Sequence, residues 1–401
     1  MGVAFTSAVT MSPKHGIQSA LAEQAIPFAP PAIGPEEIAE VVETLESGWL
    51  STGPRVASFE EAFAEYTGAG HAIAVNSCTA ALHLSLLAGA VGQGHEVITT
   101  PLTFCATANV VIHTGATPVF ADIDPDTFNL DPLAAHAAVT PRTQAILPVH
   151  FAGRPADMTA LRGLAARKSL VLIEDAAHCV EGVAQGRKVG SIGHFTCFSF
   201  YATKNLTTGE GGMVTTSDAS AAAFMRTASL HGMSRNAWTR YAPGGSAQYD
   251  VLMAGFKYNM MDVQAAIGLH QLAAIDTRLA RREAIWAQYD EALAALPLRR
   301  PAAVRAGDVH ARHLYTVLVE PTAGLSRDTL QARLRERGIS TSIHFRALHL
   351  HPFYQERFGL RRGMFPAAEA VSDSTLSLPL SGAMAPEAVD RVIEALHEVL
   401  G

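Results

Sequence analysis

The middle of the chain alternates short apolar runs with amphipathic stretches. Seven apolar runs of five or six residues have the composition of strands that are buried on both faces. They are 71–75, 96–100, 117–121, 145–149, 170–174, 195–200 and 212–216. Helical patterns separate the earlier runs, as in the stretch after Thr79 and in 157–168. This alternation predicts an α/β fold whose large, mostly parallel sheet is covered by helices on both faces.

The ends of the chain follow different patterns. A helix is predicted from Pro35, with Ile38, Val41, Val42 and Leu45 at the spacing of one helical face. After one or two long helices in 261–293, the pattern restarts with two predicted strands and two predicted helices. The strands are 314–320 and 339–345, and the helices are 326–338 and 386–400. We therefore expect a flexible N-terminal extension (1–26), a large α/β domain (27–274) and a small α+β domain (275–401).

Composition narrows the class of protein. The 401 residues are 48% hydrophobic and 17% charged, which excludes a disordered chain. A net charge of −7 argues against nucleic acid as a partner. The four cysteines form no CxxC pair, and neither a secretory signal nor an apolar run of about 20 residues is found. These features predict a cytoplasmic protein with no membrane partner.

Three features follow apolar runs, where parallel sheets bind their ligands. Ser77 or Thr79 can cap a helix whose N-terminus would attract an anion. Asp175 ends a strand, with His178 one turn later. Lys204 follows an aromatic strand and precedes a Gly-rich segment. Taken singly, each has an ordinary alternative: a helix cap, a capping Asp with a packed His, and a solvated lysine.

Together the three features match the needs of pyridoxal 5′-phosphate (PLP). This cofactor requires an anchored phosphate, a carboxylate that keeps its pyridine nitrogen protonated, and a lysine for a Schiff base. A plain nucleotide-binding α/β protein is the alternative. It would need a GxGxxG or P-loop fingerprint, and the sequence has neither.

From about residue 27 to its end, the chain resembles the DegT/DnrJ/StrS family of sugar aminotransferases, which are PLP enzymes of fold type I. The matching stretches, in order, are SGWLSTGP, NSCTAALHL, HEVITTPLTF, IEDAAH, FSFYATKNLTTGEGG, GFKYNMMDVQAAIG and SIHFRALHLHP. Their order and spacing make the resemblance specific. It implies that the large domain binds PLP.

The resemblance assigns a catalytic pair. Lys204 would form the Schiff base with PLP and shuttle protons during transamination. Asp175 would pair with the pyridine nitrogen, and His178 would lie near the ring hydroxyl, where many relatives carry Gln. Cys78 stands where relatives often carry Gly or another small residue.

The resemblance also assigns the remaining cofactor contacts. Thr79, Ala80 and Ser199 would bind the phosphate. Phe104 would stack on the cofactor ring, although a core aromatic is the simpler interpretation. Asn259 would reach the phosphate of the neighbouring subunit, although it could be a turn residue. The role of Asn259 implies a homodimer with shared active sites.

For the reaction, the resemblance implies ping-pong transfer from L-glutamate to a nucleotide-linked keto sugar. The nearest branch in appearance is the UDP-4-amino-4-deoxy-L-arabinose aminotransferases, so a UDP- or dTDP-linked 4-keto sugar is expected. His344 would lie near the substrate. Arg235 is a candidate for the donor's carboxylate, because the segment 230–232 lacks the arginine expected before His-Gly. His344, His349 and His351 could suggest a metal, but without a Cys or carboxylate at ligand spacing we expect none.

Several alternatives stay open. An aminotransferase acting on a keto-cyclitol in aminoglycoside biosynthesis would share these motifs. Sugar 3-dehydratases replace the lysine with His, so Lys204 argues against that activity. A non-catalytic regulatory protein of the same fold would be favoured by loss of the lysine or the acid. Whether the product enters lipopolysaccharide, an antibiotic or another glycan is not indicated.

Overall fold

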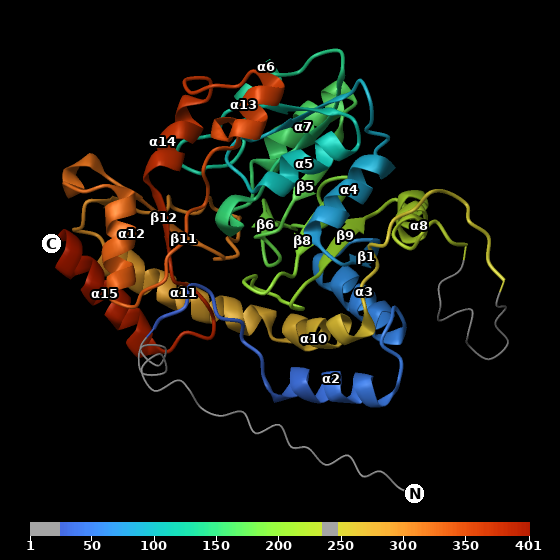
Figure 1. Ribbon diagram of the computed structural model, residues 1–401, viewed down its shortest axis with the longest axis horizontal. Helices are drawn as coiled ribbons and strands as arrows, with labels where there is room; N and C mark the ends of the chain where they lie inside the picture. The colour runs from blue at the N-terminus through green and yellow to red at the C-terminus, as the bar shows by residue number, and fades with distance from the viewer. Residues whose placement is uncertain (1–24, 235–247) are drawn as a thin grey trace, which may run out of the picture.

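The computed structural model describes residues 25–234 and 248–401, so the predicted extension falls almost wholly outside it. A seven-stranded sheet in the order β1-β9-β8-β5-β4-β2-β3 occupies the centre (Figure 1). Strand β9 runs antiparallel to both its neighbours, and the remaining pairs are parallel. The strands are His71–Val75 (β1), Glu96–Thr99 (β2), Thr117–Phe120 (β3), Thr143–Leu147 (β4), Val171–Asp175 (β5), Phe195–Ser199 (β8) and Gly212–Thr216 (β9).

Helices cover both faces of this sheet, as the near-continuous apolar strands predict. One face packs against a first group of helices through a shared apolar core. Those helices are α4 (Cys78–Ala88), α5 (Cys105–His113) and α8 (Ala219–Ala228). The other face has two apolar clusters of its own. The helices there are α3 (Pro54–Thr67), α6 (Pro132–Ala137), α7 (Met158–Lys168) and α10 (Asp262–Ala273).

A second, smaller unit of helices and strands has a separate core. It contains α11 (Ile275–Ala292), α12 (Arg327–Glu336), α15 (Pro386–Leu400) and a sheet of β10 (Leu298–Arg299), β11 (Tyr315–Val319) and β12 (Thr375–Leu378). The region 261–293 is two helices, because α10 ends before Ala274 and α11 begins after it. This break coincides with the predicted domain boundary, and the division into domains stays a prediction.

The remaining elements are short or peripheral. They are α2 (Pro35–Glu46), α13 (Pro352–Phe358), α14 (Pro366–Ser374), the hairpin of β6 (Val183–Ala184) and β7 (Arg187–Lys188), and the 3₁₀ turns Phe151–Gly153, Pro321–Ala323 and Leu348–Leu350. No helix among the described residues is both long enough and apolar enough to cross a membrane.

The predicted strand 339–345 is wrong. This segment forms only two isolated bridges, Ile339 with Ile26 and Ser342 with Ser377. Its two bridges go to different partners, so no continuous ladder forms. Residues 342–345, at the end of this segment, line the cavity described below.

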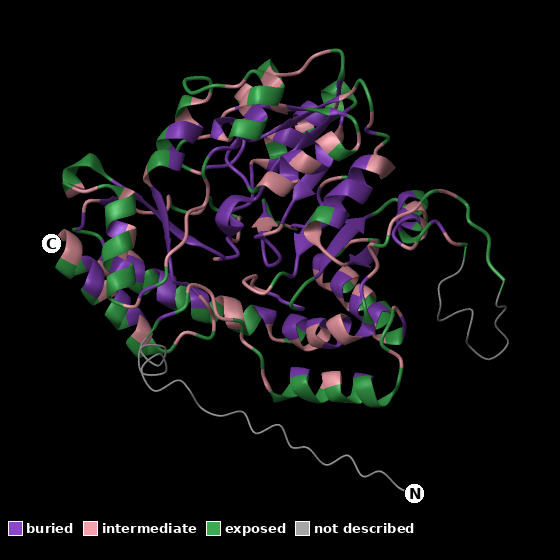
Figure 2. Ribbon diagram, in the orientation of Figure 1, coloured by how far each residue is buried: buried purple, intermediate pink, exposed green. Residues whose placement is uncertain are grey.

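Helix α2 forms as predicted, but its apolar residues do not face the core (Figure 2). Ile38 is 58% exposed and Leu45 is 53% exposed, whereas Glu37 and Thr44 are buried. The buried Glu37 carboxylate accepts hydrogen bonds from Gly34 N, Gln271 Nε2 and Arg278 Nη2. These polar contacts orient α2 and leave its apolar stripe on the surface.

Candidate active site

A cavity of about 510 Å³ lies at the carboxyl end of β5, where ligands bind in parallel sheets. Six short segments of the chain form most of its walls. They are 77–79 at the start of α4, 103–107 around the start of α5, 175–178 at the end of β5, 199–204 after β8, 210–211 before β9, and 342–345. Of the predicted site residues, Thr79, Phe104, Asp175, His178, Ser199, Lys204 and His344 line it.

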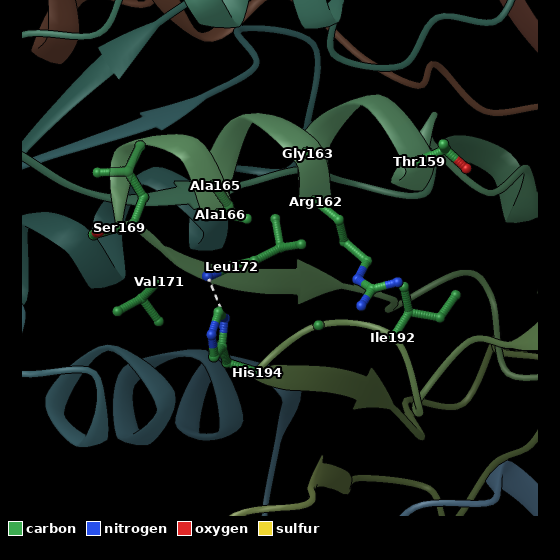
Figure 3. Close-up of a pocket in the computed structure, with 12 residues that line it drawn as sticks. Thr159, Arg162, Gly163, Ala165, Ala166, Ser169, Val171, Leu172, Ile192 and His194 are labelled. Carbon is green, nitrogen blue, oxygen red and sulfur yellow. Dashed lines mark hydrogen bonds between the residues drawn. The ribbon is translucent and has the colours of Figure 1, made fainter.

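A larger cavity of about 680 Å³ lies elsewhere, between α7 and the amino ends of β5 and β8 (Figure 3). Its lining is mostly apolar, with Arg162 and His194 as its basic residues. The ring nitrogen Nδ1 of His194 already accepts the N–H of Leu172, at 3.0 Å. Because this cavity sits at the wrong end of the strands and lacks an acid and a lysine, it is not the candidate active site.

Lys204 is the potential nucleophile of the smaller cavity. Its backbone N–H donates to Tyr201 O at 2.9 Å, which closes a turn directly after β8. Burial lowers the pKa of the Lys204 amine from 10.5 to about 8, against the opposing effects of Cys78 and Asp175. An amine with this pKa is still mostly protonated at pH 7, but it reaches its neutral, nucleophilic form far more readily than an ordinary lysine does.

Asp175 is the last residue of β5 and is buried. Thr107 Oγ1 donates to its Oδ2 at 2.8 Å, and Ala177 N donates to its Oδ1 at 3.2 Å. Burial raises the pKa of this carboxyl, while these two hydrogen bonds and the charge of Lys204 act in the opposite direction. A buried carboxylate of this kind favours a cationic partner in the cavity. The sequence analysis missed Thr107, whose only signal is its place one turn into α5.

The N-terminus of α4 offers an anion site. Ser77 is the helix cap, and its Oγ accepts the N–H of Ala80 at 3.1 Å. Ala80 therefore donates within the protein and does not line the cavity. The N–H groups of Cys78 and Thr79 find no acceptor among the described residues. Two free N–H groups at a helix N-terminus fit a phosphate.

A close contact between β9 and this helix start requires glycine. A Cβ on Gly212 would lie 2.5 Å from Ser77 C and 2.7 Å from Cys78 N. Ser199, at the end of the neighbouring β8, lines the same cavity. The structure thus places backbone donors and a hydroxyl together, as phosphate binding needs.

Of the predicted cofactor contacts Phe104 and Asn259, only Phe104 lies at the cavity. Phe104 is 60% exposed and lines the cavity, so the interpretation as a core aromatic is wrong. Asn259 does not line it. Its Nδ2 donates to Thr52 Oγ1 at 2.8 Å, and its buried Oδ1 has no partner among the described residues. Its predicted contact with a neighbouring subunit stays a prediction.

Three histidines cluster beside Lys204. The ring of His178 lies 4.5 Å from the ring of His313 and 6.4 Å from that of His344. Burial, and then the charge of Lys204, hold the pKa of His178 and His313 well below 6.5 and that of His344 at about 3. The three imidazole rings are therefore neutral. His313 was missed by the sequence analysis because it lies far from the recognised motifs.

Two further predictions concern the binding of glutamate by Arg235 and the binding of a metal by the histidines near His349. Arg235 lies outside the described residues, so its role stays a prediction. His349 Nε2 is bonded to Glu369 Oε1 at 2.9 Å, away from His344. Within residues 25–234 and 248–401, no three His, Cys, Asp or Glu side chains are grouped as metal ligands.

One cavity thus brings together a lysine of lowered pKa, a buried acid and an open helix N-terminus, which are the groups that PLP requires of a protein. The chain belongs to the DegT/DnrJ/EryC1/StrS aminotransferase family, whose model matches residues 31–397. This membership confirms the family, the α/β fold class, the transaminase activity and the PLP cofactor predicted from the sequence.

Individual relatives cover nearly the whole chain. The Bacillus subtilis spore coat polysaccharide biosynthesis protein SpsC is 52% identical, over 94% of this chain and 97% of its own. Spr1654 from Streptococcus pneumoniae, described as a sugar aminotransferase and solved in its PMP form, is 35% identical with a TM-score of 0.87, covering 93% and 98% of the two chains. DesI, solved with its TDP-sugar product, is 35% identical with a TM-score of 0.82, covering 94% and 93%.

Proposed function

We propose that this protein transfers the amino group of L-glutamate to a nucleotide-linked 4-keto sugar, carried by UDP or dTDP. Relatives support the sugar class: Spr1654 is described as a sugar aminotransferase, DesI was solved with a TDP-sugar product, and SpsC is named for polysaccharide biosynthesis. The observation that carries the proposal is Lys204, whose pKa burial lowers to about 8, in one cavity with Asp175.

Each residue of the cavity would have a definite task. The cofactor supplies an electron sink that makes the donor's Cα–H acidic. Lys204 would bond to the cofactor's aldehyde and, once released, carry the proton from Cα. Asp175 would hold the pyridine nitrogen protonated. His178 would face the ring hydroxyl, and Phe104 would stack on the ring.

The phosphate and the substrates need further contacts. Thr79, Ser199 and the free N–H groups of α4 would hold the phosphate, with the Ala80 amide reinforcing the helix cap. His344 would contact the sugar, and Arg235 the carboxylate of glutamate. Because one cavity serves both half-reactions, glutamate would react and leave as 2-oxoglutarate before the keto sugar enters, which is a ping-pong order.

We further propose a cytoplasmic homodimer with shared active sites. Support for the dimer comes from Asn259, whose buried Oδ1 lacks a partner among the described residues and could accept a donor at a subunit boundary. Support for the cytoplasm comes from the four cysteines, all of which are free thiols.

The test begins with the absorbance spectrum of the protein mixed with PLP, before and after addition of L-glutamate, for wild type and Lys204→Ala. We expect a visible band in the wild type that glutamate removes, and no such response in the variant. The aminated wild type is then offered UDP- and dTDP-linked 4-keto sugars and a keto-cyclitol. Recovery of the band with the cyclitol alone would overturn the sugar assignment in favour of the aminoglycoside alternative. No PLP band in folded protein would overturn the role of Lys204.

A further inference from the structure

Asn205, the residue after Lys204, ties the lysine loop to distant parts of the chain. Its Nδ2 donates to Ala311 O at 2.8 Å and to Glu181 Oε2 at 3.0 Å, and its Oδ1 lies 3.1 Å from His313 Nδ1. Glu181 in turn forms a fully buried ion pair with Arg282 of α11. The loop is thus anchored to the long helix that begins the small unit.

These contacts determine where the protons lie. A carboxylate and a carbonyl can only accept, so the end of Asn205 that faces Glu181 and Ala311 must be the amide NH₂. The other end is then the oxygen, which can only accept. His313 must therefore donate from Nδ1. Since burial keeps His313 neutral, its Nε2 carries a lone pair.

The neighbouring His178 must hold its proton on the other nitrogen. Its Nδ1 is buried with no hydrogen-bond partner among the described residues. A buried N–H without an acceptor loses a full hydrogen bond and is rarely tolerated. The proton of neutral His178 is therefore expected on Nε2. The two neighbouring rings, tilted at 42° to each other, have opposite tautomers, and among the described residues the tautomer of His313 is set by its contact with Asn205.

We propose that Asn205 is a positioning residue that fixes the tautomer of His313 and holds the Lys204 loop against Glu181. The N–H of this neutral ring then points to the amide oxygen of Asn205, and the lone pair stays on Nε2. Only the kinetic part of the test rests on the proposed function, because the tautomer is a property of the cofactor-free chain.

The first measurement is a long-range ¹H–¹⁵N correlation spectrum of cofactor-free protein labelled at histidine, with His313 assigned from the signals lost in His313→Asn. We expect a protonated Nδ1 and an unprotonated Nε2 at His313, and a changed pattern in Asn205→Ala. A proton on Nε2 in the wild type, or an unchanged pattern in Asn205→Ala, would overturn the proposal whichever donor and keto sugar the enzyme uses.

The second measurement is the rate of the glutamate half-reaction in the PLP-loaded enzyme. Asn205→Ala should be slower by about 10- to 100-fold, the scale expected when a reacting group is misplaced. Asn129→Ala is the matched control. Asn129 also donates twice, to Arg154 O and Pro155 O, and accepts from Phe151 N. Like Asn205 it does not line the cavity, but unlike Asn205 it is not adjacent to Lys204 in the chain. Equal rates in the two variants would refute the positioning role.

A pair of substitutions at His313 separates hydrogen bonding from packing. His313→Asn places an amide N–H near the position of Nδ1 and should keep most of the rate, whereas His313→Leu fills the space without a donor and should be as slow as Asn205→Ala. If the Asn and Leu variants are equally slow, donation from this position is not what matters and the proposal fails.

Discussion

Lys204→Met should stabilise the cofactor-free protein at neutral pH. Burial lowers the pKa of this amine from 10.5 to about 8, so folding disfavours its charged form. At 1.36 kcal/mol per pKa unit, the difference corresponds to about 3 kcal/mol. Methionine has a similar length and no charge. Because the side chain keeps some contact with solvent, we expect a measured gain of about 1 to 3 kcal/mol.

The gain must depend on pH with a definite sign. Between pH 8 and 10.5 the unfolded chain holds the lysine proton and the folded chain does not, so the wild type's free energy of unfolding rises with pH. Below pH 8 both states are protonated and the wild type bears the full cost of a buried charge. The advantage of Lys204→Met is therefore largest below pH 8 and disappears above pH 10.5.

The assay is urea unfolding of cofactor-free wild type and variant at pH 7 and at the highest pH that both tolerate. Lys168→Met, at the exposed end of α7, is the control for removing a lysine charge from the surface. We expect a gain for Lys204→Met that shrinks with pH and no comparable trend for the control. An equal gain at both pH values, or a loss at pH 7, would refute the account of Lys204 as a desolvated cation.

Three further outcomes follow from contacts in the cavity. Asp175→Asn would remove the proposed charge-assisted hydrogen bond to the pyridine nitrogen, worth about 1.5–3 kcal/mol, so the Kd for PLP should rise by about 10- to 150-fold in equilibrium titration. Ser77→Ala removes the cap of α4 and should lower the free energy of unfolding by about 1 kcal/mol in urea. The control Asp218→Ala removes the cap of α8 and should lower it by a similar amount, but should leave PLP affinity unchanged. Gly212→Ala places a Cβ 2.5 Å from Ser77 C and should weaken PLP binding, while the circular dichroism spectrum stays that of folded protein. Unchanged affinity would mean that the start of α4 does not hold the phosphate.

The strands of the large sheet were predictable because both faces of the sheet are buried, so the residues of a strand are mostly apolar whichever face they point to. Each is apolar along its whole length, since helices cover both faces, and the observed strands agree with the predictions to within about two residues. Lys204, Asp175 and Thr79 could be found for a related reason. Each lies at the carboxyl end of such a strand or within five residues after it, and these strand ends converge on one cavity.

The orientation of α2 could not be obtained from its periodicity. The spacing of Ile38, Val42 and Leu45 predicts a helix correctly but does not say which side packs inward. That choice depends on Glu37, whose partners Gln271 and Arg278 lie more than 230 residues further along the chain. A satisfied buried carboxylate outweighs the exposure of a few aliphatic side chains here, because an unpaired buried charge is the costlier alternative.

Asn205, near the candidate active site, is a second case in which the sequence alone could not reveal the contacts of a residue. Its position beside Lys204 is plain in the sequence, but its contacts depend on Glu181, 24 residues earlier, and on Ala311 and His313, more than 100 residues later. The local sequence pattern can locate residues that follow a strand, because the position of the strand determines where those residues lie. It cannot locate hydrogen-bond partners that meet only after the small unit has packed against the large sheet. The tautomer of His313 is thus a tertiary property, which is why a substitution at Asn205, and not one at the histidine alone, is needed to reveal it.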